Sequence, residues 1–302
     1  MKRNRLGLSD LEVSEIGLGC MSIGTDKTKA VRIIHEALDK GVNFFDTADI
    51  YDAGRNEEIV GEALKGRRQD VILATKVGNR RIPGKDGFAW DPSRAYIRSA
   101  VKESLRRLGT DYIDLYQLHG GTIDDPIDET IEAFEELKRE GVIRYYGISS
   151  IRPNVIREYV KRSNIVSVMS QYSILDRRPE EEVLPLLAER GIGVIARGPV
   201  AQGILSEKGT EKAAKGYLDY DKEELLSILE GLGRLGGGSR DIVHTAIQFS
   251  LSHPAVATVI PGASSLEQLR HNLAAAEAPP LSQEELDAIR KLSRANRYEL
   301  HR

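Results

Sequence analysis

Eight short runs of apolar and β-branched residues alternate with amphipathic helical patterns along the chain, and this alternation restricts the fold more than any other feature. Several runs are apolar at successive positions, which is typical of strands in a parallel sheet that is covered on both faces. The runs occupy residues 16–20, 42–47, 71–76, 113–119, 143–149, 165–171, 191–197 and 256–262. The sequence therefore predicts eight parallel strands with helices between them.

The segments between the predicted strands carry apolar stripes at helical spacing. Stripes within residues 30–38, 97–108 and 127–137 are each followed by a glycine, and Ser93 stands where the second of these helices would begin. No linker or low-complexity segment divides the 302 residues, so we expect a single domain over residues 1–302. Eight β/α units in one domain favour a closed (β/α)8 barrel, or TIM barrel, with an open doubly wound sheet as the alternative.

Three segments interrupt the simple alternation. The segment LGLSDLEVSEIG, before the first strand, predicts a β-hairpin that turns at Ser9–Asp10 and plugs the bottom of the barrel. Residues 77–92, which include the only tryptophan, Trp90, and residues 198–240, which end near Gly236–Gly238, follow predicted strands. Long loops within a compact domain are usually lids or binding loops, so we expect both to lie on the catalytic face.

The composition excludes several classes of protein. The formal net charge is −3, so no overall field would attract nucleic acid or an acidic membrane. No stretch approaches 18 consecutive apolar residues, and the basic N-terminus lacks the apolar region of a secretory signal. Cys20 is the only cysteine, which excludes an internal disulfide and suits a reducing compartment. We expect a cytoplasmic protein in which Cys20 is a small buried apolar group rather than a nucleophile.

Polar side chains stand at the ends of seven predicted strands. The carboxyl ends of barrel strands converge around one mouth, so residues far apart in the sequence can meet there. A single polar residue at a strand end is usually a cap, but an acid, a lysine and a histidine in one series favour an active site. The series consists of Cys20, Asp46, Lys76, His119, Ser149, Gln171 and Arg197.

Four of the side chains near this mouth form a chemically coherent set. Tyr51 follows Asp46 by five residues, close enough to fold back over the mouth. A neighbouring Lys76 ammonium would lower the tyrosine pKa from its ordinary value near 10, and Asp46 would keep that ammonium charged. His119 would orient a carbonyl oxygen by hydrogen bonding. Such a set can donate a proton to oxygen while a cofactor delivers hydride to carbon.

The sequence resembles the aldo-keto reductase superfamily, specifically its bacterial members with short loops. The resemblance rests on GLGCMSIG, DTADIYDAGRNEEIVGEAL, ATKVG, DYIDLYQLH, GVIRYYGIS and VIPGASSLEQLRHNLAA, in this order over nearly the whole chain. It implies reduction of small carbonyl compounds by a nicotinamide cofactor. It also implies that Asp46, Tyr51, Lys76 and His119 form the catalytic tetrad, with Tyr51 as the proton donor.

The resemblance further implies a cofactor that lies extended across the barrel mouth without a Rossmann fold. Gly17 and Gly19 resemble the start of a dinucleotide fingerprint, but the third glycine and the helix are missing, so we interpret them as part of a tight strand. Ser149 and Gln171 would hold the nicotinamide carboxamide. The remaining residues implied at the cofactor are Arg197, Gly198, Val200, Gln202 and Gly203 at the nicotinamide and pyrophosphate, and Ser264, Gln268 and Asn272 at the adenosine end.

Several positions depart from the family pattern. Ser150 stands where asparagine is frequent, and Arg197 stands where many members stack a tyrosine on the nicotinamide. No basic residue occupies position 262, 264 or 268, where a cation often grips the 2′-phosphate, although Arg270 is close in sequence. This absence weakens the case for NADP(H), which we nevertheless expect, with NAD(H) as the alternative. Trp90 is either loop packing or a wall of the substrate pocket.

Histidine and cysteine spacing predicts no metal site. The chain has no HxH, HExxH or paired-cysteine motif, and His244 and His253 have no acidic or histidine partner at ligand spacing. His35, within the first predicted helix, is interpreted as a packing or surface residue.

Two other functions compete with the reductase interpretation. Some proteins of this superfamily are cofactor-sensing subunits of channels that turn over slowly, but the sequence has no unexplained apolar run for an assembly surface. A Schiff-base lyase would use Lys76 as its nucleophile, but Asp46 beside it would keep the lysine protonated.

Overall fold

The computed structural model describes residues 1–82, 84, 87–235 and 240–302, and its centre is a parallel sheet of eight strands. The strands are hydrogen-bonded in the order β12-β11-β10-β9-β8-β5-β4-β3. Parallel bridges from Ile16 to Val259 and from Gly19 to Gly262 bring the first and last strands together and close the barrel. The strands are β3 (Leu18–Gly19), β4 (Phe44–Asp46), β5 (Ile72–Val77), β8 (Ile113–Leu118), β9 (Ile143–Ser149), β10 (Ser167–Gln171), β11 (Gly193–Arg197) and β12 (Val256–Ile260). The predicted (β/α)8 barrel is confirmed, and each predicted run overlaps one of these strands.

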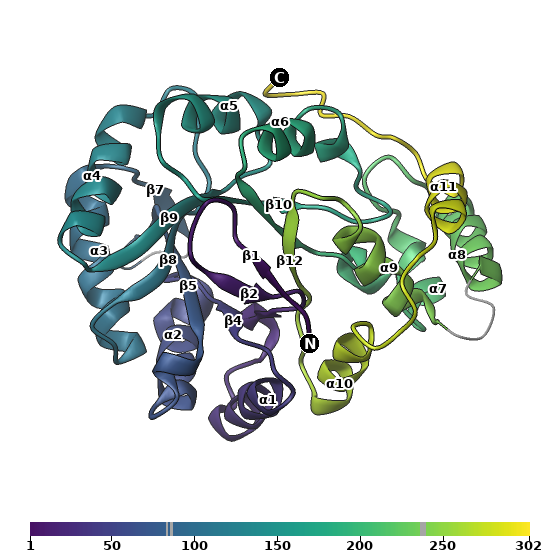
Figure 1. Cartoon of the computed structure of the whole chain (residues 1–302), viewed down its shortest axis with the longest axis horizontal. Coiled ribbons are helices and arrows are strands. Elements are labelled where there is room, and N and C mark those ends of the chain that lie inside the picture. The colour runs from purple at the N-terminus through teal and green to yellow at the C-terminus, as the bar shows by residue number, and fades with distance from the viewer. Residues whose placement is uncertain (83, 85–86, 236–239) are drawn as a thin grey trace.

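Helices surround the sheet, as Figure 1 shows in a view along the barrel. The helices of the outer ring are α1 (Lys27–Asp39), α2 (Arg55–Leu64), α3 (Arg94–Leu108), α4 (Ile127–Arg139), α5 (Pro153–Arg162), α6 (Val183–Glu189), α9 (Ile242–Leu251) and α10 (Leu266–Ala274). The predicted ends of α3 are confirmed, because the Ser93 side chain accepts a hydrogen bond from the Tyr96 amide and Gly109 ends the helix at φ 61°.

The predicted N-terminal hairpin closes the bottom of the barrel. It consists of β1 (Arg3–Arg5) and β2 (Glu12–Ser14), paired antiparallel. Leu6, Leu11 and Val13 are fully buried in a cluster with inward-facing residues of the barrel. Gly7 permits this close approach, because a Cβ there would lie 2.3 Å from the Val166 carbonyl oxygen.

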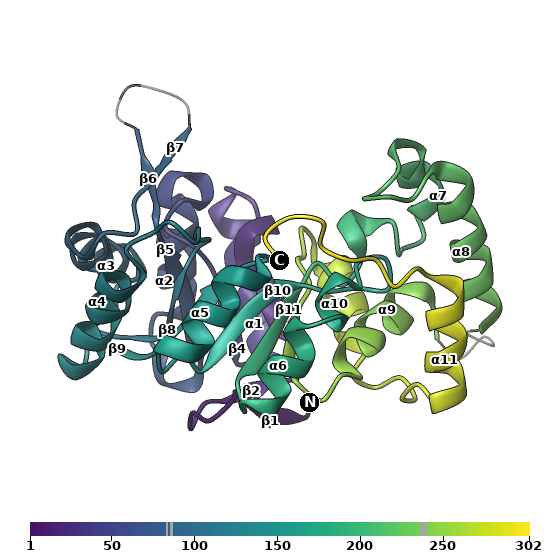
Figure 2. The same cartoon turned by 90° about the horizontal axis from the view of Figure 1, so that it is seen from above.

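The two long segments carry more regular structure than the sequence predicted. Within residues 77–92, β6 (Asn79–Arg81) and β7 (Phe88–Trp90) form a hairpin that projects at the end of the barrel opposite β1 and β2, as Figure 2 shows. Within residues 198–240, α7 (Gly209–Lys212) is short, but α8 (Lys222–Leu235) is a full helix that packs against α9 and α11 (Gln283–Leu292). The prediction of a loop is therefore wrong for residues 222–235. Gly236–Gly238 lie outside the described residues.

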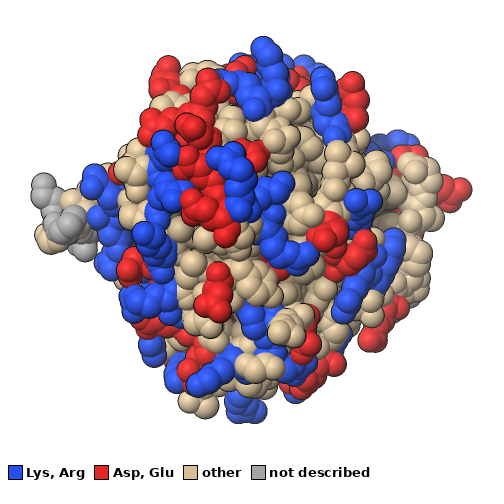
Figure 3. All heavy atoms as spheres, turned by 60° about the vertical axis from the view of Figure 1, so that its left-hand side comes forward, with Lys and Arg blue, Asp and Glu red and all other residues tan. Residues whose placement is uncertain are grey.

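The surface has charges of both signs. Figure 3 shows basic and acidic side chains interspersed on the face that lies at the left-hand side of Figure 1. Ion pairs between α3 and α4 are typical of it, with Arg98 bonded to Glu136 at 3.0 Å and to Glu140 at 2.8 Å. In the part of the chain that the structure describes, no helix combines the length and apolar character that a membrane crossing requires.

Candidate active site

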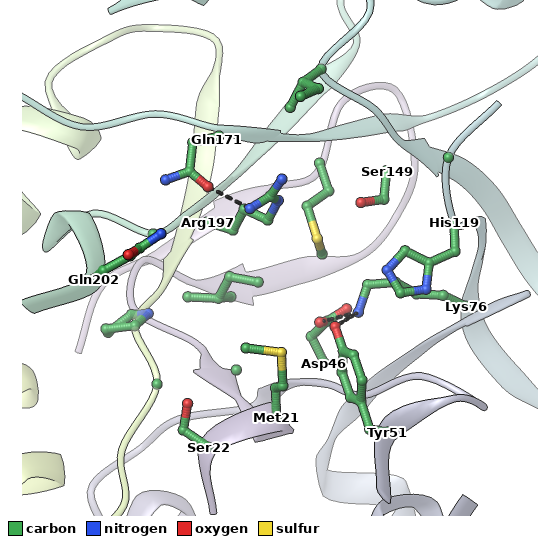
Figure 4. Close-up of a pocket in the computed structure, with 18 of the residues that line it drawn as sticks. Met21, Ser22, Asp46, Tyr51, Lys76, His119, Ser149, Gln171, Arg197 and Gln202 are labelled. Carbon is green, nitrogen blue, oxygen red and sulfur yellow. Dashed lines mark hydrogen bonds and ion pairs between the residues drawn. The ribbon is translucent and has the colours of Figure 1, made fainter. Parts of the chain in front are cut away.

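A cleft of about 1120 Å³ opens at the carboxyl ends of the barrel strands. The four side chains of the predicted tetrad (Asp46, Tyr51, Lys76 and His119) line it together, as Figure 4 shows. The predicted cofactor residues that also line it are Ser149, Gln171, Arg197, Gly198, Val200, Gln202, Gly203, Ser264 and Gln268. The cleft thus brings together residues from most of the barrel strands and from the segments that follow them.

The Lys76 ammonium lies at the centre of the tetrad. Its Nζ donates hydrogen bonds to Asp46 Oδ2 at 2.5 Å and to the Thr47 carbonyl oxygen at 2.7 Å, and it lies 3.2 Å from Tyr51 Oη. Asp46 pairs with Ala74 across β4 and β5, so Asp46 and Lys76, two residues beyond Ala74, share one face of the sheet. The register of two adjacent strands therefore places the ion pair.

Burial and charge act in opposite directions on this ion pair. Burial raises the pKa of Asp46. Burial alone would lower the pKa of Lys76, but the Asp46 carboxylate and the Tyr51 hydroxyl outweigh it and hold that pKa above its ordinary value. Lys76 is therefore an ammonium at neutral pH, which is not the state of a Schiff-base nucleophile.

Lys76 lowers the pKa of Tyr51 as expected, but burial of the phenol outweighs it, so that the net pKa is raised. The physical reason is that a phenolate buried beside Asp46 loses water and meets a second negative charge. Tyr51 is consequently a neutral phenol, which carries the proton that a donor must supply.

The backbone after Tyr51 is strained. Asp52 and Ala53 have φ angles of 47° and 61°, and Gly54 follows at 89°. Left-handed conformations cost residues with a side chain about 1–3 kcal/mol each and are found preferentially at functional sites. This turn returns the chain from β4 into α2, and it leaves the Tyr51 side chain over the barrel mouth.

His119 faces the tyrosine across the cleft. Its ring centroid lies 6.0 Å from that of Tyr51, with the two rings nearly perpendicular. Burial, with Lys76 and Arg197 nearby, lowers the His119 pKa to about 3, so the imidazole is neutral at physiological pH. Its Nδ1 is buried without a hydrogen-bond partner among the described residues. His119 lines the cleft, and a neutral imidazole can donate a hydrogen bond from its ring N–H to an oxygen atom there.

The predicted nicotinamide end contains a second polar group. Arg197 Nη1 donates to Gln171 Oε1, and Gln171 Nε2 donates to Tyr217 Oη at 3.0 Å. Ser149, at the end of β9, lines the cleft between this group and the tetrad. The sequence did not single out Tyr217, because nothing in its segment indicates that the chain returns to β10.

The segment after β11 borders the cleft with strained backbone and positive charge. Ala201, Gln202 and Gly203 have φ angles of 46°, 58° and 85°. Lys212 Nζ donates to the Gln202 carbonyl oxygen at 2.9 Å, and both Lys212 and Arg197 line the cleft. Lys212 was not predicted from the sequence, because it lies in a helix of four residues beyond the family motif.

The predicted adenosine end is formed by the start of α10. Ser264 donates through its amide and its hydroxyl to Gln268 Oε1, at 2.9 and 3.1 Å. Asn272 is buried and does not line the cleft; its Nδ2 donates to the Gly262 carbonyl oxygen at 3.0 Å and supports the edge from beneath. Arg270 points elsewhere, because its guanidinium pairs with Glu36 of α1, with Nη2 at 2.9 Å from Oε2.

Trp90 connects the β6–β7 hairpin to the cleft. Its indole Nε1 donates to Asp125 Oδ1 at 2.9 Å, and its side chain lines the cleft near Gly120. A Cβ at Gly78 would lie 2.6 Å from the indole ring. Trp90 therefore packs within the loop and lines the cleft, and its contact with substrate stays a prediction.

Two buried groups, Gln117 and Cys20, lie close to Asp46 without lining the cleft. Gln117 Nε2 donates to Asp46 Oδ1 at 3.1 Å, so both carboxylate oxygens of Asp46 are hydrogen-bonded. The sequence could have indicated Gln117, since it alternates with Leu115, whose side chain faces the barrel interior. Cys20 is fully buried and burial raises the pKa of its thiol, as expected of an inert apolar group.

Comparisons with known proteins place the chain among described relatives. A family model described as "Aldo/keto reductase family" matches residues 15–294. An oxidoreductase of Bacillus subtilis strain 168, YqkF, is 58% identical over 100% of both chains, and probable aldo-keto reductase 1 of Glycine max is 32% identical over 94% of this chain and 87% of its own length. The holo form of aldo-keto reductase AKR11C1 from Bacillus halodurans has a TM-score of 0.96 and 63% identity, covering 100% of this chain and 99% of that one. The apo form of the same enzyme has a TM-score of 0.87.

Proposed function

The chain belongs to the aldo/keto reductase family, and we propose that it reduces aldehydes or ketones to alcohols with Tyr51 as the proton donor. It is an NAD(P)-dependent oxidoreductase. The observation that carries the proposal is the position of Lys76 Nζ, 2.5 Å from Asp46 Oδ2 and 3.2 Å from Tyr51 Oη in a buried cluster.

The cleft fits a nicotinamide dinucleotide. Arg197 and Lys212 supply positive charge for a pyrophosphate, and Gly19 and Gly262 leave space along the edge near β3 and β12. A Cβ at Gly262 would lie 2.5 Å from Ser22 Oγ, so a side chain would fill this edge. The fold is also more similar to the holo form of AKR11C1 than to its apo form, with TM-scores of 0.96 and 0.87.

Under this proposal each member of the tetrad has a distinct task. The bound cofactor would supply the hydride that no side chain can provide. His119, a neutral imidazole, would hold the carbonyl oxygen by donating a ring N–H, and Tyr51 would donate its hydroxyl proton to that oxygen. Lys76 would stabilise the resulting phenolate, and Asp46 would keep Lys76 charged and oriented.

We propose for the cofactor residues the roles that the family resemblance implies. Ser149 and Gln171 would hold the carboxamide of the nicotinamide. Gln171 would then have to give up its hydrogen bond from Arg197 or bind both groups at once. The segment 198–203 would lie along the pyrophosphate, with Ser264 and Gln268 at the adenosine. Asn272 would support this end through Gly262 rather than touch the cofactor. We propose NADP(H) as the cofactor, with NAD(H) as the alternative.

Replacement of Tyr51 tests the proposal. Tyr51→Phe should lower the turnover of carbonyl reduction about 10²-fold or more, since it removes the general acid, and should leave cofactor affinity within a few-fold of wild type. Cofactor oxidation would be followed with aldehydes, diketones and quinones. Tyr145→Phe is the matched control, because the Tyr145 hydroxyl contacts Asp10 at the other end of the barrel. A Tyr51→Phe variant that keeps more than a tenth of the turnover would show that another group donates the proton.

A further inference from the structure

Three potential metal ligands meet where α9 and α10 pack together, outside the catalytic cleft. His271 Nε2 lies 2.5 Å from Asp241 Oδ2, and His244 Nδ1 lies 3.7 Å from Asp241 Oδ1. One ligand atom from each residue lies within 4.8 Å of the others. The sequence interpretation that His244 has no partner at ligand spacing is therefore wrong. His271 is 27 positions away in the sequence, and only the packing of the two helices brings it close.

Hydrogen bonds orient the three side chains toward one another. His244 Nε2 lies 3.1 Å from the His271 carbonyl oxygen. A carbonyl oxygen only accepts, so Nε2 carries the hydrogen and the lone pair of a neutral His244 is on Nδ1, which faces Asp241. This arrangement, in which the second ring nitrogen donates to a backbone carbonyl, is the usual support of a metal-binding histidine.

Asp241 is similarly prepared. Its Oδ1 accepts the His244 amide at 2.8 Å as the N-cap of α9, which fixes the carboxylate and leaves Oδ2 toward His271. The neighbouring Arg240 does not neutralise it, because that guanidinium bonds to Glu285 and to the Pro279 carbonyl oxygen. All three ligand residues are partly exposed, so a metal ion and a water molecule could reach them.

We propose that Asp241, His244 and His271 bind one divalent transition-metal ion of the zinc type. Two imidazole nitrogens and one carboxylate oxygen are a ligand set that Zn²⁺ accepts, with water in the fourth position of a tetrahedral site. The metal ion would replace the hydrogen between His271 and Asp241. Since His271 precedes Asn272, which supports Gly262, the ion would clamp α9 to α10 behind the edge of the cleft.

Titration with ZnCl2 tests the site in the full-length, tag-free protein after treatment with a chelator. Calorimetry should give one tight Zn²⁺ site per chain, and Co²⁺ should give the visible absorption of a four-coordinate ion. The melting temperature should rise with Zn²⁺.

Two conservative variants separate ligation from folding. Asp241→Asn keeps an N-cap oxygen, and His271→Gln keeps an amide that can reach Asp241. Each should fold as wild type in chelator and should bind Zn²⁺ at least ten-fold more weakly. His35→Gln is the matched control, because His35 Nε2 also contacts a backbone carbonyl oxygen, that of Ala63 at 2.9 Å, but belongs to no such cluster among the described residues.

Either of two results would overturn the site. One is a Zn²⁺ affinity of the wild type that differs by less than three-fold from the Zn²⁺ affinity of His271→Gln. The other is binding that fails to saturate at one ion per chain. Neither result depends on reductase activity, so the metal site and the proposed function fail separately.

Discussion

At the scale of single residues, the contacts of the buried Lys76–Asp46 pair determine how directly each residue of the tetrad acts on Tyr51. Lys76 acts directly on the tyrosine, whereas Asp46 acts through Lys76 and Gln117 holds the far oxygen of Asp46. Lys76→Met should therefore lower turnover at least as much as Tyr51→Phe, and Asp46→Asn should be milder. Initial rates measured over a range of pH give the comparison.

The pH profile of Asp46→Asn carries further information. The Asp46 carboxylate raises the pKa of Lys76. Without this carboxylate the lysine should lose its charge at lower pH, and the alkaline limb of the pH–rate profile should shift to lower pH. A profile that coincides with that of wild type would contradict the proposal that Asp46 acts on Tyr51 through Lys76.

Asp49 is a partly buried acid that the proposed mechanism does not use, and its raised pKa makes the free energy of unfolding depend on pH. Burial, with Glu57 nearby, raises its pKa from 3.8 to about 7, and its Oδ1 has no hydrogen-bond partner among the described residues. The folded state then binds the proton more tightly than the unfolded state. Ionisation of Asp49 therefore lowers the free energy of unfolding as pH rises from 3.8 to about 7. A pKa shift of this size lowers the free energy of unfolding by at most about 4 kcal/mol.

Asp49→Asn should remove this penalty. The stability advantage of the variant over wild type should grow as pH rises through that interval and stay constant above it. Chemical denaturation at several pH values measures it, with exposed Asp124→Asn as the control. An advantage that is the same at pH 5 and pH 8 would mean that Asp49 is ionised in the fold throughout.

At the scale of elements, the sequence predicted those whose apolar pattern is set by the barrel itself. The strand runs and the stripes of α1, α3 and α4 face the core, so their periodicity is visible without a structure. α8 was missed, although Leu225, Ile228 and Leu232 are buried at helical spacing, because Gly231 and Gly233 interrupt the pattern. The β6–β7 hairpin was missed because its strands have three residues each.

The site was predictable where residues end strands and unpredictable where helices meet. Asp46, Lys76 and His119 were predicted from strand ends, and Tyr51 from its position five residues after Asp46. The contacts of Arg270 with Glu36 and of His271 with Asp241 depend on how neighbouring helices pack, which no local pattern records. The direction of the Tyr51 pKa depends on burial, which also requires the fold.

The α10 segment should determine how strongly the enzyme prefers NADPH. A charge-assisted hydrogen bond to phosphate contributes about 1.5–3 kcal/mol, or roughly ten-fold to over a hundred-fold in affinity. Ser264 and Gln268 offer no cation, and Arg270 is held by Glu36. We expect NADPH to be preferred over NADH by less than about a hundred-fold, and Ser264→Arg to increase the preference.

Fluorescence titration of both reduced cofactors measures this preference. Arg270→Gln is the control and should leave the ratio of the two affinities unchanged. A much larger preference that Arg270→Gln removes would show that Arg270 leaves Glu36 when cofactor binds. An equal affinity for both cofactors would identify an NAD enzyme.

At the scale of the whole molecule, the barrel separates stability from chemistry. The N-terminal hairpin fills one end, and the tetrad and cleft occupy the other, with the inward-facing residues of the strands between them. In barrels of this type the carboxyl ends of the strands carry catalysis, and the opposite face contributes to stability. A change at the hairpin should therefore alter the free energy of unfolding without altering catalysis.

Leu11 offers the sharpest test of this separation. It is 1% exposed and packs into the barrel interior, so Leu11→Ala should lower the free energy of unfolding by about 2–5 kcal/mol. Leu8, in the same hairpin, is 72% exposed, and Leu8→Ala should change it by less than about 0.5 kcal/mol. Well below the melting temperature of the weaker variant, both should keep the wild-type kcat/KM. A drop in kcat/KM for folded Leu11→Ala would mean that the hairpin controls the geometry of the tetrad through the length of the barrel.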